Sequence, residues 1–215
     1  MRCARSRIAV GVGLAFALAS CGPAHRPKAS LDPAAASREQ KQIAALIDDL
    51  GVPVEGLHGS CMPYPHSKAD DAYAGLLKIG APAVPALIDV LADSNVYRRA
   101  HAAGLLGEIG DPRAVPPLDA RLDKEVDANG WVIDAVGNLH DPRSVDALVP
   151  LLSKGSGVIH SLPATVPTVG QRAAYAIAEI GKPAKARLML ALRSSNPDTR
   201  ANAKFALDRL SKRAG

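Results

Sequence analysis

Aromatic residues are scarce in this sequence of 215 residues. Phe, Trp and Tyr together make up 3% of the chain, and there is one Trp. So little aromatic surface disfavours a pocket for a flat organic group, and we expect no small-molecule cofactor. The apolar residues are mainly Ala and Leu rather than Val, Ile and aromatics, which disfavours a strand-rich fold.

Sequence signatures of catalysis are also missing. The chain has no Gly-rich phosphate loop, no His-Glu-x-x-His motif and no recognisable Ser-His-Asp arrangement. Adjacent acids occur at Asp48-Asp49 and Asp70-Asp71. Neighbours on a helix point to different faces, so such pairs are typical of solvated or capping residues. We therefore expect that the protein is not an enzyme.

Acidic residues are absent from residues 1–20, which carry three Arg. Without this segment the formal net charge falls from +5 to +2. The basic balance of the whole chain is therefore partly the property of a targeting segment, and we expect no nucleic-acid partner.

The N-terminus has the order of a bacterial export signal. A basic start, MRCARSR, precedes an apolar run of twelve residues, Ile8 to Ala19. Twelve residues are too few for a membrane-spanning helix, which needs about 20, but they are typical of a signal peptide. The run ends Leu18-Ala19-Ser20-Cys21, which resembles the lipobox of bacterial lipoproteins. The alternative is an ordinary signal peptide with an incidental cysteine.

The lipobox resemblance implies a modified N-terminus. Residues 1–20 would be removed, and Cys21 would carry a diacylglyceryl thioether and further acylation with a fatty acid such as palmitate. Two or three acyl chains anchor a protein stably in a membrane. Gly22 rather than Asp follows the cysteine. By resemblance to lipoprotein sorting, this implies a cell-envelope location at the outer membrane, facing the periplasm.

Little cysteine is left after processing. Cys3 would leave with the signal and Cys21 would be lipidated, so Cys61 would remain alone. No intramolecular disulfide is then possible, and the Cys61 thiol is either buried or available to a partner. Residues 22–36 contain three Pro and no helical periodicity, so we expect a flexible tether that reaches at most about 50 Å.

The rest of the chain repeats itself. Pro82, Pro112 and Pro142 lie 30 residues apart, and Pro183 follows after 41, which is one repeat with an insertion. Two sets of apolar residues keep these intervals and add a further 30: Ile79, Ile109, Leu139, Ile180 and Leu210, and Leu76, Leu106, Val136, Ile177 and Leu207. Such self-similarity indicates a repeat architecture.

Each repeat predicts two helices. Gly80, Gly110 or Gly181 ends the first helix, where a left-handed residue is favoured. Asp111-Pro112 and Asp141-Pro142 then supply a capping side chain and a first-turn proline for the second helix. Small residues recur within the first helices, which allows close packing, and all four are Ala: Ala72, Ala102, Ala173 and Ala203.

This pattern resembles the HEAT-like repeats of the phycobilisome-lyase type. The resemblance implies an all-α fold, an α-solenoid of HEAT-like antiparallel helix pairs with about four repeats plus end caps. We expect repeats at about 71–95, 96–125, 126–153 and 170–195, with a terminal helix at 197–211. A helix at 37–50 with Ser37 as N-cap would close the other end. The expected organisation is a signal peptide at 1–20, lipidated Cys and tether at 21–36, capping helix and loop at 37–70, and the repeat domain at 71–215.

Three places are candidates for binding chemistry. The loop 51–70 holds His58, Cys61 and His66, which could bind a soft metal ion, with His160 in another loop; the alternative is a loop with no metal. Residues 182–215 carry nine bases and two acids, which is typical of a solvated end cap or of a contact with anionic lipid or an acidic partner.

The third candidate is a surface for a protein partner. Trp131 takes the repeat position of His101 and Arg172, so it either packs across a repeat junction or forms an exposed interaction residue. The insertion at about 154–169 carries Val158, Ile159, Leu162 and Val166 outside any helical period. We expect the second helices to line a groove, with this insertion as one wall.

The functional hypothesis is a membrane-anchored lipoprotein that binds an envelope protein or peptide through its solenoid. The alternative is an envelope metal-binding protein or enzyme that uses the loop with His58, Cys61 and His66.

The anchor hypothesis predicts the effect of one substitution. Cys21→Ser should move the protein from the membrane to the soluble fraction, or leave the precursor uncleaved, because the acceptor thiol is gone. Fractionation followed by immunoblotting measures this. Membrane association unchanged by the substitution would contradict lipidation at Cys21.

Overall fold

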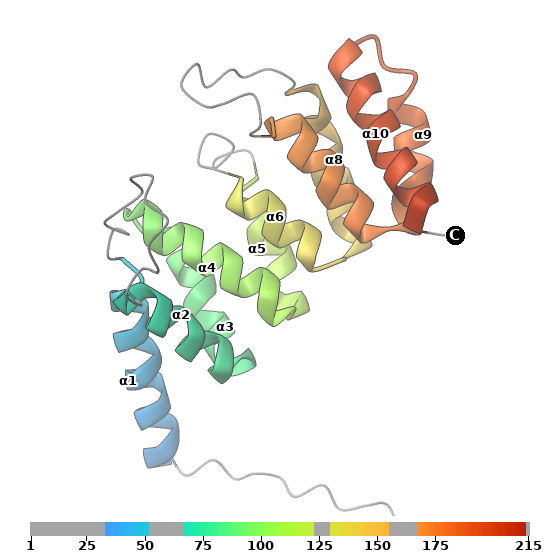
Figure 1. The fold of residues 1–215 in the computed structure, drawn as a ribbon. Helices are drawn as coiled ribbons and strands as arrows, with labels where there is room; N and C mark the ends of the chain where they lie inside the picture. Colours follow the sequence, from blue (N-terminus) through green and yellow to red (C-terminus); the bar gives the residue numbers. More distant parts are fainter. Residues whose placement is uncertain (1–32, 52–66, 123–129, 155–166, 214–215) are drawn as a thin grey trace, which may run out of the picture.

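The protein is an α-solenoid. The computed structural model describes residues 33–51, 67–122, 130–154 and 167–213, and within these ranges every regular element is helical (Figure 1). The first helices of successive pairs are α2 (Lys68–Ile79), α4 (Val96–Ile109), α6 (Trp131–Asn138), α8 (Val169–Ile180) and α10 (Pro197–Arg213). The second helices are α3 (Val84–Val90), α5 (Val115–Asp119), α7 (Val145–Leu148) and α9 (Lys185–Ala191).

Short 3-10 turns connect the elements of each pair. They lie at Ala81–Ala83, Pro112–Ala114, Pro142–Ser144 and Lys182–Ala184, and η4 (Val149–Ser153) extends α7. The expected fold class is confirmed, and the helices fall within the repeat ranges that the sequence predicts, apart from one to three residues at their starts.

The N-terminal capping helix starts earlier than expected. Helix α1 spans Pro33–Asp49, so Ser37 lies inside it and is not its N-cap, and its first turns occupy the end of the expected tether. Proline suits the first turn of a helix, and the three Ala that follow Pro33 are strong helix formers. Ile43 and Leu50 are buried, while Leu46 and Ile47 are half-buried, so α1 still packs its predicted apolar face.

The core follows the predicted repeat in the first helices. Leu76, Leu106, Val136 and Ile177 are fully buried. In the second helices the equivalent buried residues are Leu87, Leu118, Leu148 and Leu188, at intervals of 31, 30 and 40. This shift by one residue has a local cause, because Arg113 and Arg143 lengthen the turns of the second and third repeats.

The turns are therefore of two kinds. Gly110 is left-handed (φ 74°, ψ 19°), as predicted, whereas Gly80 and Gly181 combine positive φ (69° and 91°) with extended ψ (−131° and −148°). That second combination is essentially confined to glycine. The shorter turn of the first and fourth repeats therefore requires glycine, while the longer turn of the third repeat accepts His140 at φ 51°.

The longer turns are held by an Asp-Pro-Arg motif. The carboxylate of Asp111 accepts from the backbone N–H of Arg113 at 2.9 Å, and its two oxygens also accept from the Arg113 guanidinium. Asp141 and Arg143 repeat this arrangement. The hydrogen bonds from each Arg side chain hold the pKa of its Asp below the usual range. The predicted capping role of both Asp residues is confirmed.

Successive first helices touch at glycine and alanine. A Cβ atom on Gly107 of α4 would lie 2.7 Å from Cα of Ala135 on α6, and one on Gly137 of α6 would lie 2.9 Å from Cα of Ala176 on α8. Real side chains do not approach backbone so closely, so these two positions have no room for one. We call these contacts, Gly107–Ala135 and Gly137–Ala176, the glycine seam.

A longer repeat is superimposed on the short one. Residues 67–110 and 168–211 correspond at a constant offset of 101. Both segments open with a capping box, Ser67 with Asp70 and Thr168 with Gln171. Asn95 and Asn196 then occupy equivalent places and cap α4 and α10 with the same bonds. The two ends of the array therefore use the same local structures.

One further property concerns membranes. Within the part of the chain that the structure describes, no single helix is both long and apolar enough to cross a bilayer. The pair formed by Lys68–Ile79 and Ala81–Val90 meets the length and composition criteria together, with a bend of 106° between them.

Candidate functional site: the first-helix face

The exposed aromatic side chains of the described residues gather on the first helices. Tyr97 is 44% exposed, Trp131 45%, Tyr175 39% and Phe205 36%. On the 30-residue ruler these residues occupy positions i, i+4 and i+7 of one helical stripe, because Trp131 matches His101 and both Tyr175 and Phe205 match Gly104. Residues at these spacings share one side of a helix. We call this stripe, from Tyr97 to Phe205, the first-helix face.

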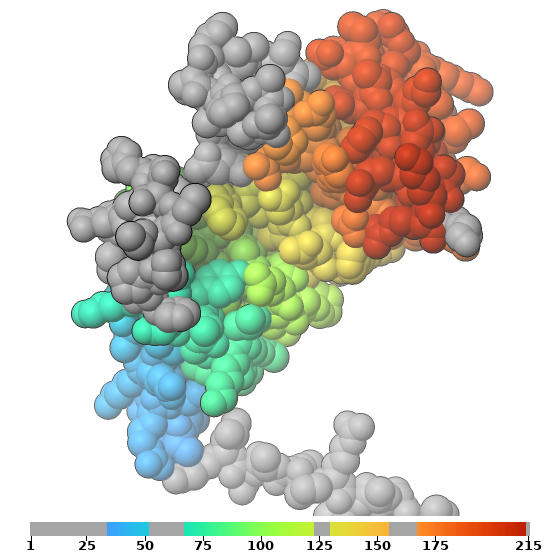
Figure 2. Space-filling view, in the orientation of Figure 1, coloured from blue at the N-terminus to red at the C-terminus, as the bar shows by residue number. Residues whose placement is uncertain are grey.

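The first helices form one continuous layer from α2 to α10 in the view of Figures 1 and 2. Because the glycine seam joins α4, α6 and α8 directly, their outward stripes lie on neighbouring ridges of this layer. The described second helices, by contrast, carry no aromatic residue.

An aromatic cluster joins α8 to α10. The rings of Tyr175 and Phe205 meet edge to face with centroids 4.8 Å apart, and the Arg209 guanidinium lies 4.4 Å from the Tyr175 centroid. Arg209 also lies 3.5 Å from Glu179, which pairs with Arg213 as well. The Tyr175 ring thus has a cation on one face, while a large part of its surface remains exposed.

Polar side chains pair across the same layer. Arg172 of α8 lies against Gly130 and pairs with Asp134 of α6 at 2.7 Å. Burial raises the pKa of Asp134, and the Arg172 charge opposes that shift. Between α2 and α4, the Tyr73 hydroxyl donates to Glu108 at 2.8 Å. Burial, followed by this bond and the Glu108 charge, raises the pKa of Tyr73, so the phenol keeps its proton as a donor.

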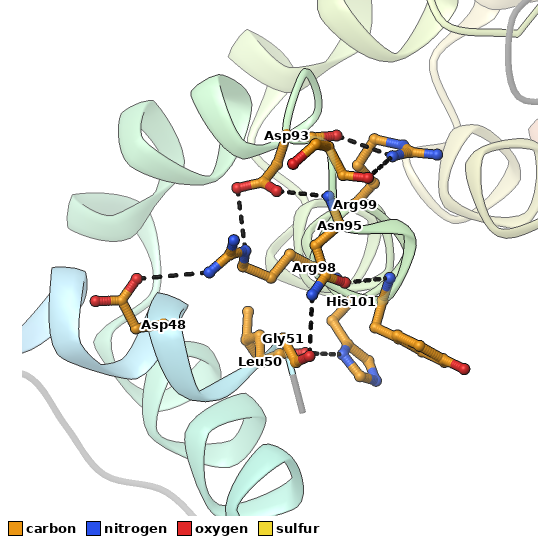
Figure 3. Close-up of polar contacts among 10 residues, drawn as sticks. Asp48, Leu50, Gly51, Asp93, Asn95, Arg98, Arg99 and His101 are labelled. Atoms are coloured by element: carbon orange, nitrogen blue, oxygen red, sulfur yellow. Dashed lines mark hydrogen bonds and ion pairs between the residues drawn. The ribbon is translucent and has the colours of Figure 1, made fainter. Parts of the chain in front are cut away.

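One edge of the layer is held by the N-terminus of α4 (Figure 3). The Asn95 side-chain oxygen accepts from the backbone N–H groups of Tyr97 and Arg98, and its amide donates to the Gly51 carbonyl at 3.0 Å. The Arg98 guanidinium lies 3.0 Å from Asp93 and 3.6 Å from Asp48. A backbone bond from Asn95, and then the Arg98 charge, lower the pKa of Asp93. This cluster docks the end of α1 on α4.

His101 and Asn202 play equivalent parts at this edge. The Nδ1 atom of His101 lies 3.0 Å from the Leu50 carbonyl, and the Asn202 amide donates to the Leu152 carbonyl at 3.0 Å. Since a carbonyl only accepts, the imidazole proton is on Nδ1. Trp131 takes the same position in α6, where it is exposed instead of bonded inward as an Asn or His is. Its interaction role stays a prediction.

Most of the other residues singled out in the sequence lie outside the described residues. This applies to the lipidation candidate Cys21, to the metal candidates His58, Cys61, His66 and His160, and to the apolar insertion residues Val158, Ile159, Leu162 and Val166. Within the described ranges, no group of three His, Cys, Asp or Glu side chains is arranged to hold a metal ion.

The sequence reasoning missed three of the four exposed aromatic residues. Tyr175 and Phe205 lie 30 residues apart in equivalent positions, so the repeat ruler itself carried that signal. Tyr97 lies four residues before His101, the position equivalent to Trp131, which places both on one stripe. We expected a groove lined by second helices, but the exposed aromatic residues lie on the first helices.

Comparison with known proteins agrees with this architecture. Residues 71–129 and 84–163 match the family model of HEAT repeats. A search of curated proteins found no match. Among solved structures, the chain is similar to the complex of CpcE and CpcF of phycocyanin lyase from Nostoc sp. PCC7120, at 20% identity and a TM-score of 0.48, covering 75% of this chain and 71% of that one. It is also similar to ARO, an armadillo repeats only protein from Plasmodium falciparum, at 13% identity and a TM-score of 0.41, covering 81% and 94%.

The class of protein is thus an α-solenoid with HEAT repeats. The match covers the first three repeats, while the fourth pair and α10 continue the same packing beyond it.

The cluster at the start of α4 generates a prediction with an internal control. Asn95→Ala removes an N-cap and the bond to Gly51, whereas Asn196→Ala removes only the equivalent N-cap. Each cap is worth about 0.5–2 kcal/mol, and the extra bond about 1 kcal/mol. We therefore expect Asn95→Ala to lower the free energy of unfolding about 1 kcal/mol more than Asn196→Ala. Urea unfolding followed by circular dichroism measures both, and equal losses would mean that Asn95 does not dock α1.

Proposed function

We propose that this protein is a lipid-anchored adaptor that binds an envelope protein or peptide through its first-helix face. The observation that carries the proposal is the row of exposed aromatic side chains on consecutive first helices, Tyr97, Trp131, Tyr175 and Phe205. Trp and Tyr are the residue types most enriched where single residues dominate a protein interface. In a chain with 3% aromatics, four exposed on one stripe mark a surface under a specific constraint.

The charges of the same face fit a polypeptide partner. Arg172 with Asp134, and Arg209 and Arg213 with Glu179, pair within the layer instead of leaving charge of one sign unpaired. Arg and Asp side chains held in this way form a fixed polar rim around aromatic anchors, which is how stable protein interfaces are built. A strongly single-signed surface would instead favour nucleic acid, which the proposal leaves out.

The proposed anchor is compatible with access to this face. Helix α1 lies at the opposite end of the array from α10 (Figure 1). Twelve residues separate Cys21 from Pro33, so a lipid on Cys21 would hold the start of α1 within at most about 40 Å of the bilayer. The first-helix face from α4 to α10 would then remain accessible to a partner. The proposed location is the cell envelope, at the outer membrane facing the periplasm.

The proposal assigns no catalytic role to the chain. Its work would be to hold a partner near the membrane, with binding energy concentrated at the aromatic stripe. Solenoids are suited to this because their repeats present a long continuous surface.

A site-specific cross-linking experiment tests the binding face. A photoreactive amino acid at Trp131 of the full chain, expressed in cells, should give covalent adducts with the partner, and one at Ala120, which is exposed at the end of α5, should not. With the captured partner purified, Trp131→Ala should weaken binding by about 30-fold, as expected for a residue that dominates an interface.

The control is Leu77→Ala, because Leu77 has similar exposure at 37% but lies off the stripe. It should leave affinity unchanged. Adducts at Ala120 and none at Trp131 would place the partner on the second helices and contradict the proposal.

A further inference from the structure

Helix α9 is the last of the second helices, and α10 has no second helix after it. The effect is visible at the first residue of each second helix. Val84, Val115 and Val145 are buried there, whereas α9 has Lys185, which is exposed. A polar residue at this place is expected in a terminal repeat, because its outer side meets solvent.

Two other positions of α9 break that rule. Met189 is 51% exposed and Leu190 57%, the largest values among the large apolar side chains of the described residues. The residues equivalent to Leu190 are also exposed but small or polar, namely Asp89, Ala120 and Pro150. The residues equivalent to Met189 are half-buried, namely Ile88, Asp119 and Val149. A terminal repeat therefore presents more exposed apolar surface than the internal ones.

Basic side chains surround these two residues. Lys182, Lys185 and Arg193 are all exposed, and none of the three forms an ion pair within the described residues. Helical spacing places Arg193 near Met189 and Leu190, at i+4 and i+3, while Lys185 precedes Met189 by four. Arg187, by contrast, is held by Asp146 of α7 at 2.7 Å. We call Met189 and Leu190 with Lys182, Lys185 and Arg193 the α9 face.

We propose that the α9 face binds the surface of an anionic phospholipid bilayer. Met189 and Leu190 would enter the boundary between headgroups and acyl chains, and the three long basic side chains would reach the lipid phosphates. Each Lys or Arg near an anionic bilayer adds to the attraction. The proposal is independent of lipidation at Cys21, since α9 lies at the other end of the array from α1 (Figure 1).

The chemistry of the face favours lipid over a second copy of the chain. A symmetric dimer through α9 would bring Lys182, Lys185 and Arg193 against their own equivalents, and like charges at short range repel. A bilayer with anionic headgroups offers opposite charge around an apolar interior. That order matches two apolar side chains inside a basic rim.

A local fluorescence measurement tests the proposal in the full chain. Cys3, Cys21 and Cys61 are replaced by Ser, and an environment-sensitive fluorophore is attached at Leu190→Cys or, as the matched reference, at Asp89→Cys in α3. Vesicles contain phosphatidylcholine alone or with 30% phosphatidylglycerol, each with nitroxide-labelled lipid. A local readout is needed because residues 1–20 can bring the chain to any vesicle.

We expect the label at position 190 to shift to shorter wavelength and to be quenched in the phosphatidylglycerol vesicles, with no response at position 89. Reversing Lys182, Lys185 and Arg193 to Glu should weaken this local contact by about a hundredfold or more. The matched control reverses three exposed lysines at the other end, Lys41, Lys68 and Lys78, and should leave the quenching intact.

Three outcomes would overturn the proposal. Equal quenching at positions 190 and 89, or quenching that is independent of phosphatidylglycerol, would mean that the contact is not made by this face. A concentration-dependent shift at position 190 without vesicles would assign the face to a second copy. A response to polyglutamate but not to vesicles would assign it to an acidic protein. Circular dichroism of each variant checks that the helices are intact.

Discussion

The spacing of the array depends on two places where helix backbones meet without side chains between them. At Gly107 and Gly137 of the seam, the next helix presents Ala135 and Ala176 so closely that even a methyl group would overlap backbone atoms. Interiors pack at the density of organic crystals, so such contacts fix the distance between neighbouring helices closely. The remaining contacts of α4, α6 and α8 are arranged around this distance.

The seam also explains where large side chains can lie. A layer of first helices joined by Gly and Ala has no space inward for Trp or Tyr, because the inner positions are filled by residues such as Leu106 and Ile177. Aromatic residues on these helices therefore point outward, and close spacing puts them on adjacent ridges. Within α8 and α10 this brings Tyr175 and Phe205 into edge-to-face contact. The second helices carry the other distinctive surface, the basic and apolar α9 face.

Much of the fold could be predicted from the sequence because its signals are periodic. Leu106 and Val136 lie on a ruler that any helical solenoid must keep, and both are fully buried. The shift in the second helices could not be predicted from the prolines, since Arg113 and Arg143 add a residue after Pro112 and Pro142. The exposure of the aromatic stripe could not be predicted either. The same i, i+4, i+7 spacing marks a buried face in one helix and a solvent face in another, and only packing decides between them.

The glycine seam is tested most directly by the sign of a stability change. Gly→Ala inside a helix ordinarily stabilises by up to about 1 kcal/mol. At Gly75 of α2 the new Cβ would meet only the flexible Leu46 side chain at 3.2 Å, so Gly75→Ala should be neutral or stabilising. Gly107→Ala should instead destabilise by about 1–3 kcal/mol, because the methyl group meets backbone of α6. The free energy of unfolding in urea measures both variants. A Gly107→Ala protein as stable as Gly75→Ala would contradict the account, since the first helices would then not be in backbone contact.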